Sequence, residues 1–219
     1  MSPAQLLAYL GPALVYAALI ALPLHGLLGL IDRRRVAAGP AVQGGALAVA
    51  GGSAGGRRDG RHLLSLWLIA FFLVLTQHPL PDPATLDCRG GGVAPILRPF
   101  AFLDTYQRLW RQGAGPAVWI GTKNIQSSLM NFGLPALIGV ALARHLGGRR
   151  PWLRALGIAV AVSGGAELLQ YTALLGLYPC RYRYFEVDDL ILNIGGLMTG
   201  FLAWRAWAGL ERGRGGAGP

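Results

Sequence analysis

The sequence predicts an all-α protein that crosses a membrane about five times. Three observations support this fold class: 53% of the 219 residues are hydrophobic, only 14% are charged, and the apolar residues gather in long runs. A soluble domain carries about 25% charged residues, and about 20 apolar residues cross the hydrocarbon core as a helix. We therefore expect a polytopic transmembrane helical bundle, a multi-pass protein of a cell membrane.

Five apolar runs are long enough to span, and each ends at a proline or an arginine-containing segment. The first is too long for the core of a signal peptide, which has about 7–15 residues, so we expect it to be retained. Residues 96–110 alternate aromatic side chains with arginine over a length too short to span, which predicts an interfacial helix. The predicted spans are residues 6–31, 63–77, 118–143, 152–178 and 187–207.

The arginines predict how the spans are oriented. They concentrate in the first loop, the third loop and the tail, and the positive-inside rule assigns such segments to the cytoplasm. We therefore expect the N-terminus outside and the C-terminus inside. The same rule accounts for the net charge of +10, so we expect no nucleic-acid partner. Residues 1–62 are assigned to the first span and a basic, Gly/Ala-rich cytoplasmic linker (36–56), and residues 63–219 to a membrane domain.

Cys88 and Cys180 are the only two cysteines, and this orientation places both on the outer, oxidising side. A disulfide between them is one interpretation, and two unpaired, partly buried thiols are the other. The four histidines share no spacing with cysteine or glutamate, so we expect no metal site and no cofactor.

Two predicted spans contain polar residues where burial in hydrocarbon is costly, which by default indicates a site. Glu167 and Gln170 are three residues apart and share a helical face. Asp188 and Asp189 begin the last span, and two arginines in the preceding short loop can reach down to pair with a carboxylate. The candidate ligand-binding residues are Glu167, Gln170, Arg181, Arg183, Asp188, Asp189 and Asn193.

Spacings of 4, 3 and 4 residues place Asp189, Asn193, Gly196 and Gly200 on one helical stripe. Gly196 and Gly200 permit close approach of a neighbouring helix. Two interpretations of the polar residues remain open. They form either a hydrogen-bonded lock between the last two spans or an outward-facing pocket for a polar head group.

The run Glu167-Leu-Leu-Gln170, the arginine-containing loop and the segment Val187-Asp188-Asp189-Leu-x-x-Asn193-x-x-Gly196-x-x-x-Gly200 resemble the signature of the VanZ-like membrane family. Leu97-Arg98-Pro99-Phe100 resembles the Pro-Phe motif of that family, so the resemblance extends over residues 97–201. It implies a polytopic protein of the bacterial cell envelope. The founding member of the family is associated with low-level resistance to the glycopeptide antibiotic teicoplanin.

The first functional hypothesis is a non-enzymatic membrane protein whose outward-facing site lies between the last two spans. Its ligand is a lipid-linked envelope precursor or a lipophilic glycopeptide, and its other partners are membrane lipids. The alternative is an intramembrane enzyme that acts on a lipid, with Glu167 and Asp188 or Asp189 as acid and base. A third hypothesis is a small transporter or assembly subunit, although the sequence has no inverted repeat.

Overall fold

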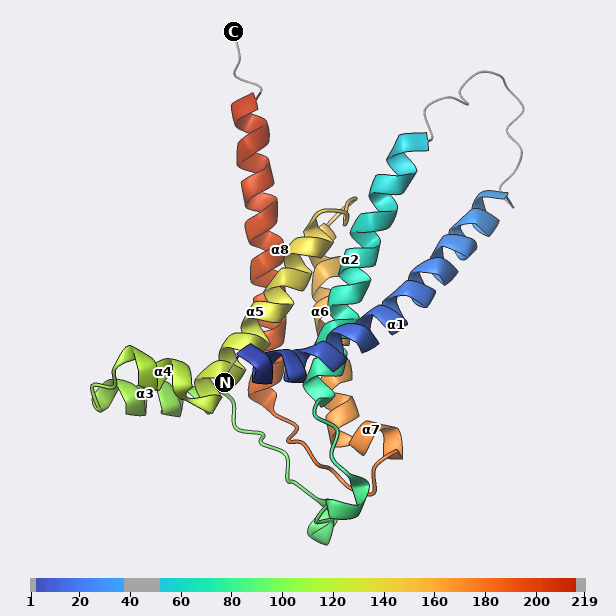
Figure 1. Ribbon diagram of the computed structural model, residues 1–219. Coiled ribbons are helices and arrows are strands. Elements are labelled where there is room, and N and C mark those ends of the chain that lie inside the picture. The colour runs from blue at the N-terminus through green and yellow to red at the C-terminus, as the bar shows by residue number, and fades with distance from the viewer. Residues whose placement is uncertain (1–2, 38–51, 216–219) are drawn as a thin grey trace, which may run out of the picture. The chain divides into compact units, whose positions relative to one another are not determined.

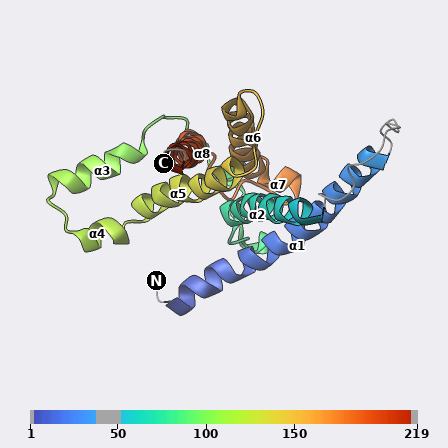
Figure 2. The same cartoon turned by 90° about the horizontal axis from the view of Figure 1, so that it is seen from above.

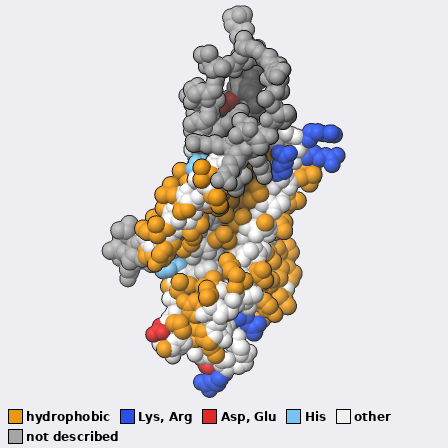
Figure 3. Space-filling model, turned by 90° about the vertical axis from the view of Figure 1, so that its right-hand side faces the viewer, with side chains coloured by type: hydrophobic (Ala, Val, Ile, Leu, Met, Phe, Trp, Pro, Cys, Tyr) orange, Lys and Arg blue, Asp and Glu red, His pale blue; other side chains and the backbone are white. Residues whose placement is uncertain are grey.

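The computed structural model describes residues 3–37 and 52–215, with side chains over residues 10–30 and 60–211. These ranges contain helices and connecting segments and no β-strand, so the all-α prediction is confirmed. Five of the described helices are long and apolar enough to cross a membrane, as predicted. On the face shown in Figure 3, hydrophobic side chains cover most of the described surface, as contact with lipid requires.

The chain divides into two compact units, Met1–Val74 and Leu75–Pro219. The first unit contains α1 (Pro3–Ala37) and most of α2 (Gly52–Gln77). Ala13, Ala17 and Ala21 follow each other at four-residue spacing in α1 and are almost fully buried. This stripe of small side chains is the arrangement that lets another helix approach closely.

The predicted linker, residues 36–56, lies largely outside the described residues. Where the structure describes the chain again, from Gly52, it is already helical, and α2 begins before the predicted second span at residue 63. Hydropathy marks the part of a helix that suits lipid, and a helix whose end is polar continues beyond that part. The sequence pattern therefore located the apolar part of α2 and not the beginning of the helix.

The second unit is built around three long helices, α5 (Lys123–Ala143), α6 (Pro151–Tyr171) and α8 (Val187–Gly215). Figures 1 and 2 show these helices side by side, with the short helices α3 (Phe102–Arg111) and α4 (Pro116–Gly121) extending away from α6. α5 and α8 run parallel, so their N-terminal ends meet at the same end of the unit. This arrangement determines where the polar first turns of both helices lie.

Glycines allow α5 and α8 to pack backbone against backbone. A Cβ atom built on Gly196 would lie 2.1 Å from the carbonyl oxygen of Phe132, and one on Gly200 would lie 2.0 Å from that of Ala136. On the α5 side, a Cβ atom built on Gly139 would lie 2.0 Å from the carbonyl oxygen of Leu197 in α8. The partner of the Gly196–Gly200 stripe is therefore α5, the third candidate span.

Two predicted spans are each divided into a long and a short helix. The predicted third span, residues 118–143, breaks at Thr122, whose extended backbone separates α4 from α5. Its hydroxyl donates to the carbonyl oxygen of Val118 at 2.7 Å, which satisfies an end of α4. The predicted fourth span, residues 152–178, breaks at Thr172, where the short turn α7 (Ala173–Gly176) begins. The interfacial helix predicted for residues 96–110 is shorter in the structure and corresponds to α3.

The loops before α3 and before α8 run side by side. Two 3₁₀ turns, η1 (Pro83–Thr85) and η2 (Arg89–Gly91), precede the first of them. Parallel bridges then join Gly92 to Arg181 and Ile96 to Glu186. Gly92 has a φ of +84°, and its missing Cβ would lie 2.1 Å from the carbonyl oxygen of Arg181, so only glycine fits there.

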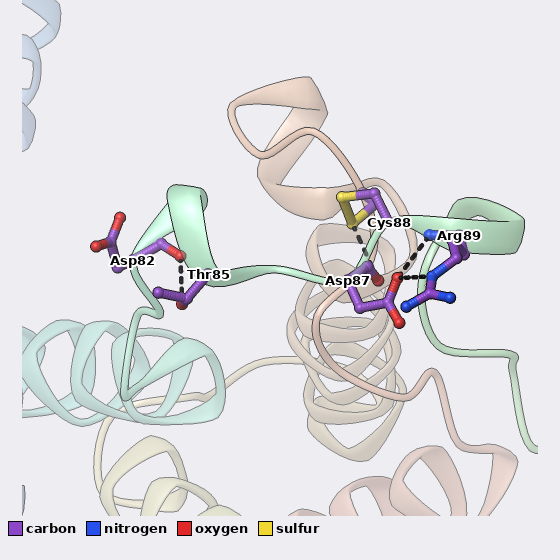
Figure 4. Close-up of a disulfide and its surroundings, with 6 residues drawn as sticks. Asp82, Thr85, Asp87, Cys88 and Arg89 are labelled. Carbon is purple, nitrogen blue, oxygen red and sulfur yellow. Dashed lines mark hydrogen bonds and ion pairs between the residues drawn. A yellow bond between two sulfur atoms is a disulfide. The ribbon is translucent and has the colours of Figure 1, made fainter.

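A disulfide joins the same two loops. The Sγ atoms of Cys88 and Cys180 are bonded at 2.06 Å across a sequence separation of 92. Figure 4 shows this bond beside the turn in which the backbone N–H and the guanidinium of Arg89 both donate to Asp87, each at 3.1 Å. The bridges and the disulfide together fix the loop before α3 against the loop before α8.

Candidate functional site

A cavity of about 400 Å³ lies at the N-terminal ends of α5 and α8, against the segment that leads into α3. Its walls come from four parts of the second unit: the first turns of both long helices and the two paired loops. The lining is part polar and part apolar and includes three carboxylates. It consists of Ile96, Ala101, Phe102, Asn124, Ser127, Ser128, Tyr184, Glu186, Asp188, Asp189 and Leu192.

Asp188 holds one wall of the cavity in place. Its two carboxylate oxygens accept the backbone N–H groups of Phe100, at 2.5 Å, and Phe102, at 2.9 Å. Phe102 begins α3, whose own N-cap residue, Ala101, has no side-chain oxygen to offer. Asp188 of α8 therefore performs the capping role for α3, and because both of its oxygens are used, it is a positioning residue.

Asp189 and Glu186 also line the cavity, and their carboxylate oxygens have fewer hydrogen-bond partners than those of Asp188. One oxygen of Asp189 accepts the side-chain amide of Asn131 on α5. Among the residues with described side chains, its other oxygen and the carboxylate of Glu186 have no hydrogen-bond partner. Burial raises the pKa of Glu186, and the nearby negative charge of Asp188 raises it further.

Two features lower the free-energy cost of placing three carboxylates in one cavity. Asp188 and Asp189 lie in the first turn of α8, where free N–H groups and the helix dipole favour negative charge. α5 points its own N-terminus at the same place, with Asn124, Ser127 and Ser128 on the cavity wall. Because ionised carboxylates only accept hydrogen bonds, the cavity suits groups that donate them.

A second polar cluster, which we call the anchor cluster, consists of Gln77, Glu167 and Gln170. Glu167 accepts the backbone N–H of Glu186 at 3.0 Å. Gln170 donates to the carbonyl oxygen of Thr76 at 3.0 Å, and Gln77 donates to that of Ala166 at 3.2 Å. These side chains bind backbone groups of α2, of α6 and of the residue before α8, and none of them lines the cavity.

Arg181 and Arg183 also lie outside the cavity lining. The guanidinium of Arg181 lies 5.4 Å from the ring centroid of Tyr171, a cation–π contact. Arg183 donates to the carbonyl oxygen of His78 at 2.7 Å. Neither arginine forms an ion pair with a described carboxylate within 4.0 Å, although Arg183 is close enough to Glu167 and Asp189 to attract them electrostatically.

Asn193 is buried in α8 with 3% of its surface exposed. Within the described part of the chain its Oδ1 atom has no hydrogen-bond partner, and the same holds for the hydroxyl of Ser163 on α6. A buried polar atom of this kind is costly unless a bound water satisfies it. Asn193 belongs to the interior of the helix bundle and not to the cavity wall.

The seven candidate binding residues thus do not form one cluster. Asp188 and Asp189 line the cavity, whereas Glu167, Gln170, Arg181, Arg183 and Asn193 do not. The cavity also includes Glu186 and Tyr184, which the sequence analysis did not single out, and the first turn of α5, which was not among the candidate binding residues. The available signal was the polar first turn of the third span, with Asn124, Ser127 and Ser128 at helical spacing.

Fold and site together define an α-helical membrane protein with an acidic cavity at the ends of two candidate spans. A family model described as VanZ/LLP1 matches residues 64–208. The chain therefore belongs to the VanZ/LLP1 family, as the resemblance predicted. No curated protein and no solved structure matches it.

Proposed function

We propose that this protein is a multi-pass protein of the bacterial cell membrane whose cavity binds the polar head group of an amphiphile. The head group offers hydroxyl or amine donors, as the sugars of a lipid-linked envelope precursor do. A lipophilic glycopeptide of the teicoplanin type presents similar sugars on an acyl-bearing molecule and is the second ligand of this class.

The observation that carries the proposal is the cavity of about 400 Å³ with the uncommitted carboxylate oxygens of Asp189 and Glu186. Its volume lies within the range of small-molecule sites, about 300–1,000 Å³. Its position at the ends of two candidate spans suits a ligand whose head group is polar and whose remainder lies in lipid. The three carboxylates disfavour a naked phosphate and favour hydrogen-bond donors.

We propose further that the cavity opens on the outer side, with the N-terminus outside and the C-terminus inside. Two independent features support this orientation. The arginine-rich loops favour the cytoplasmic side, and the Cys88–Cys180 disulfide belongs to the loops on the opposite side, where thiols become oxidised.

The enzymatic alternative, with Glu167 and Asp188 or Asp189 as acid and base, receives less support. Asp188 spends both carboxylate oxygens on backbone N–H groups, and Glu167 binds the backbone of Glu186 away from the cavity. A pair of carboxylates that share one substrate must both face it. We therefore favour binding over catalysis.

Binding to the purified protein in detergent tests the proposal. The probes are a prenyl diphosphate that carries N-acetylglucosamine and the same prenyl diphosphate without the sugar, with teicoplanin as a second ligand. Asp189→Asn and Glu186→Gln each remove a charged acceptor, so we expect them to weaken binding of the sugar-bearing probe about tenfold or more. Glu211→Gln, which neutralises an exposed carboxylate far along α8, is the matched control.

Two results would contradict the proposed function. One is equal affinity of the wild-type protein for the probes with and without sugar. The other is unchanged affinity for the sugar-bearing probe and for teicoplanin in both cavity variants, when thermal unfolding shows that these variants are folded.

A further inference from the structure

A second hollow, of about 350 Å³, lies on the arm formed by α3 and α4. Its walls are Tyr106, Gln107, Trp110 and Arg111 of α3, together with Trp119 of α4. The four α3 residues recur at helical spacing and therefore share one face. Three of the five lining side chains are aromatic, so the groove offers mainly apolar surface.

The side chains that hold α3 and α4 in place lie outside this groove or at its wall. Thr105 and Leu109 form the buried face of α3, and Thr105 accepts a hydrogen bond from Asn124 of α5 at 3.2 Å. Trp119 donates its indole N–H to the carbonyl oxygen of Ala114 at 3.0 Å, which fixes its ring with the polar atom satisfied. Trp110 remains 80% exposed. The groove thus has a rigid aromatic wall and an exposed aromatic edge.

A continuous series of aromatic rings connects the cavity with this groove. Phe102 lines the cavity, and its ring centroid lies 5.9 Å from that of Tyr106, which lies 5.7 Å from that of Trp119. Along α3, Tyr106 is one turn and Trp110 two turns beyond Phe102, or about 6 and 12 Å at 1.5 Å per residue. The lining of the cavity and the lining of the groove are therefore joined by contacts between aromatic rings.

Charge distinguishes the two ends of this series of rings. The cavity presents three carboxylates and no cation in its lining, whereas Arg111 stands at the edge of the groove. A phosphate that links a sugar to a hydrocarbon chain would be repelled at the first end and attracted at the second. The cavity therefore suits an uncharged head group with hydrogen-bond donors, and the groove suits an apolar chain beside an anionic group.

We propose that the groove between α3 and α4 binds the hydrocarbon chain of the amphiphile whose head group enters the cavity. This inference rests on the function proposed above. The occupant is a prenyl or acyl chain, and Tyr106, Trp110 and Trp119 contact it.

Photo-crosslinking of the full chain in lipid nanodiscs tests the inference, with two forms of the sugar-bearing prenyl diphosphate. A diazirine in the prenyl chain is expected to label α3 and α4, and a diazirine on the sugar is expected to label the first turns of α5 and α8. A phosphatidylcholine with a diazirine in its acyl chain serves as the bulk-lipid control. Labelling of the groove by this control lipid to the same extent would overturn the inference.

Two substitutions on α3 distinguish an effect of the groove from a general effect on the helix. Trp110→Ala removes an exposed groove wall without opening a buried space and should lower labelling of α4 by the prenyl chain about tenfold. Leu103→Ala, on the same helix but outside both linings, should change it less than twofold. Unchanged labelling in Trp110→Ala would also overturn the inference.

The outcomes also distinguish this inference from the proposed function. If the prenyl diphosphate without sugar labels the groove as well as the sugar-bearing form does, and Asp189→Asn changes neither, the groove is confirmed and the head-group site is wrong. If Asp189→Asn weakens only the sugar-bearing probe while Trp110→Ala has no effect, the head-group site stands and the groove is wrong.

Discussion

The cavity carboxylates (Glu186, Asp188 and Asp189) and the anchor cluster (Gln77, Glu167 and Gln170) are both sets of three polar side chains, and they differ in charge and in their partners. Both lie where candidate membrane spans meet loops in the second unit. Each side chain of the anchor cluster binds a backbone group of a neighbouring segment. In the cavity, only Asp188 binds backbone groups. Oxygens without a described partner occur in both places: on Asp189 and Glu186 in the cavity, and as the buried Oε1 atoms of Gln77 and Gln170 in the anchor cluster.

This difference shows that a polar residue in an apolar helix does not by itself indicate a ligand. A helix end that borders lipid leaves backbone groups unpaired, and a nearby glutamine or glutamate can satisfy them. Only a carboxylate that is not bound to such a backbone group remains available to a ligand. All three side chains of the anchor cluster bind backbone groups, whereas of the three cavity carboxylates only Asp188 does.

The largest effect is expected from separating α5 and α8, because both helices contribute walls to the cavity. Gly200→Leu places a side chain where even a Cβ atom would lie 2.0 Å from the backbone of Ala136. We expect a loss of at least about 3 kcal/mol in the free energy of unfolding, measured by thermal and denaturant unfolding in detergent. Gly195→Ala is the control, since its Cβ would meet nothing within 4 Å, and an equal loss there would contradict the close packing.

The next effect distinguishes the two adjacent aspartates. Asp188→Asn replaces one of two acceptor oxygens with an amide that cannot accept the N–H of Phe100 or Phe102, so we expect a loss of about 2–3 kcal/mol. Asp189→Asn should leave the unfolding free energy nearly unchanged and weaken binding of the sugar-bearing probe. Equal stability of the two variants would contradict the capping role of Asp188.

The anchor cluster is tested by two substitutions at one position. Glu167→Gln retains an oxygen that accepts the N–H of Glu186, so thermal stability and probe binding should change little. Glu167→Leu leaves this N–H unpaired and should cost about 1–3 kcal/mol. Loss of binding in Glu167→Gln with stability preserved would move Glu167 from the anchor cluster to the ligand site.

The smallest effect concerns pH. Because the pKa of Glu186 is raised in the folded chain, the folded state holds this proton more tightly than the unfolded state does. The resulting stabilisation is fully present below the ordinary value of 4.5 and is lost as the pH rises through the raised value. We expect the unfolding temperature of Glu186→Gln to fall less than that of the wild type over this window. Parallel pH profiles for the two proteins would show that the carboxyl group of Glu186 is not buried.

The sequence predicted the number of spans because hydrophobicity reports directly on contact with lipid. Helix ends were less predictable: Thr122 and Thr172 interrupt helices through backbone geometry that hydropathy does not record. The wall formed by α5 depends on two parallel helices bringing their first turns together, and this follows from tertiary packing. Asp188 and Asp189 were among the candidate residues, but the difference between them, one that caps α3 and one that keeps a carboxylate oxygen without a described partner, depends on contacts with residues some 60–90 positions away in the sequence.

The disulfide has a consequence for the covalent connectivity of the site. It closes a ring that runs from Cys88 to Cys180 and contains α3, α4, α5, α6 and α7, whereas α8 lies outside the ring. A single backbone cut anywhere in the α3–α4 arm would therefore leave the chain in one covalent piece until a reductant is added. A cut in the short segment between Arg181 and Glu186 would release α8, and with it both aspartates of the cavity.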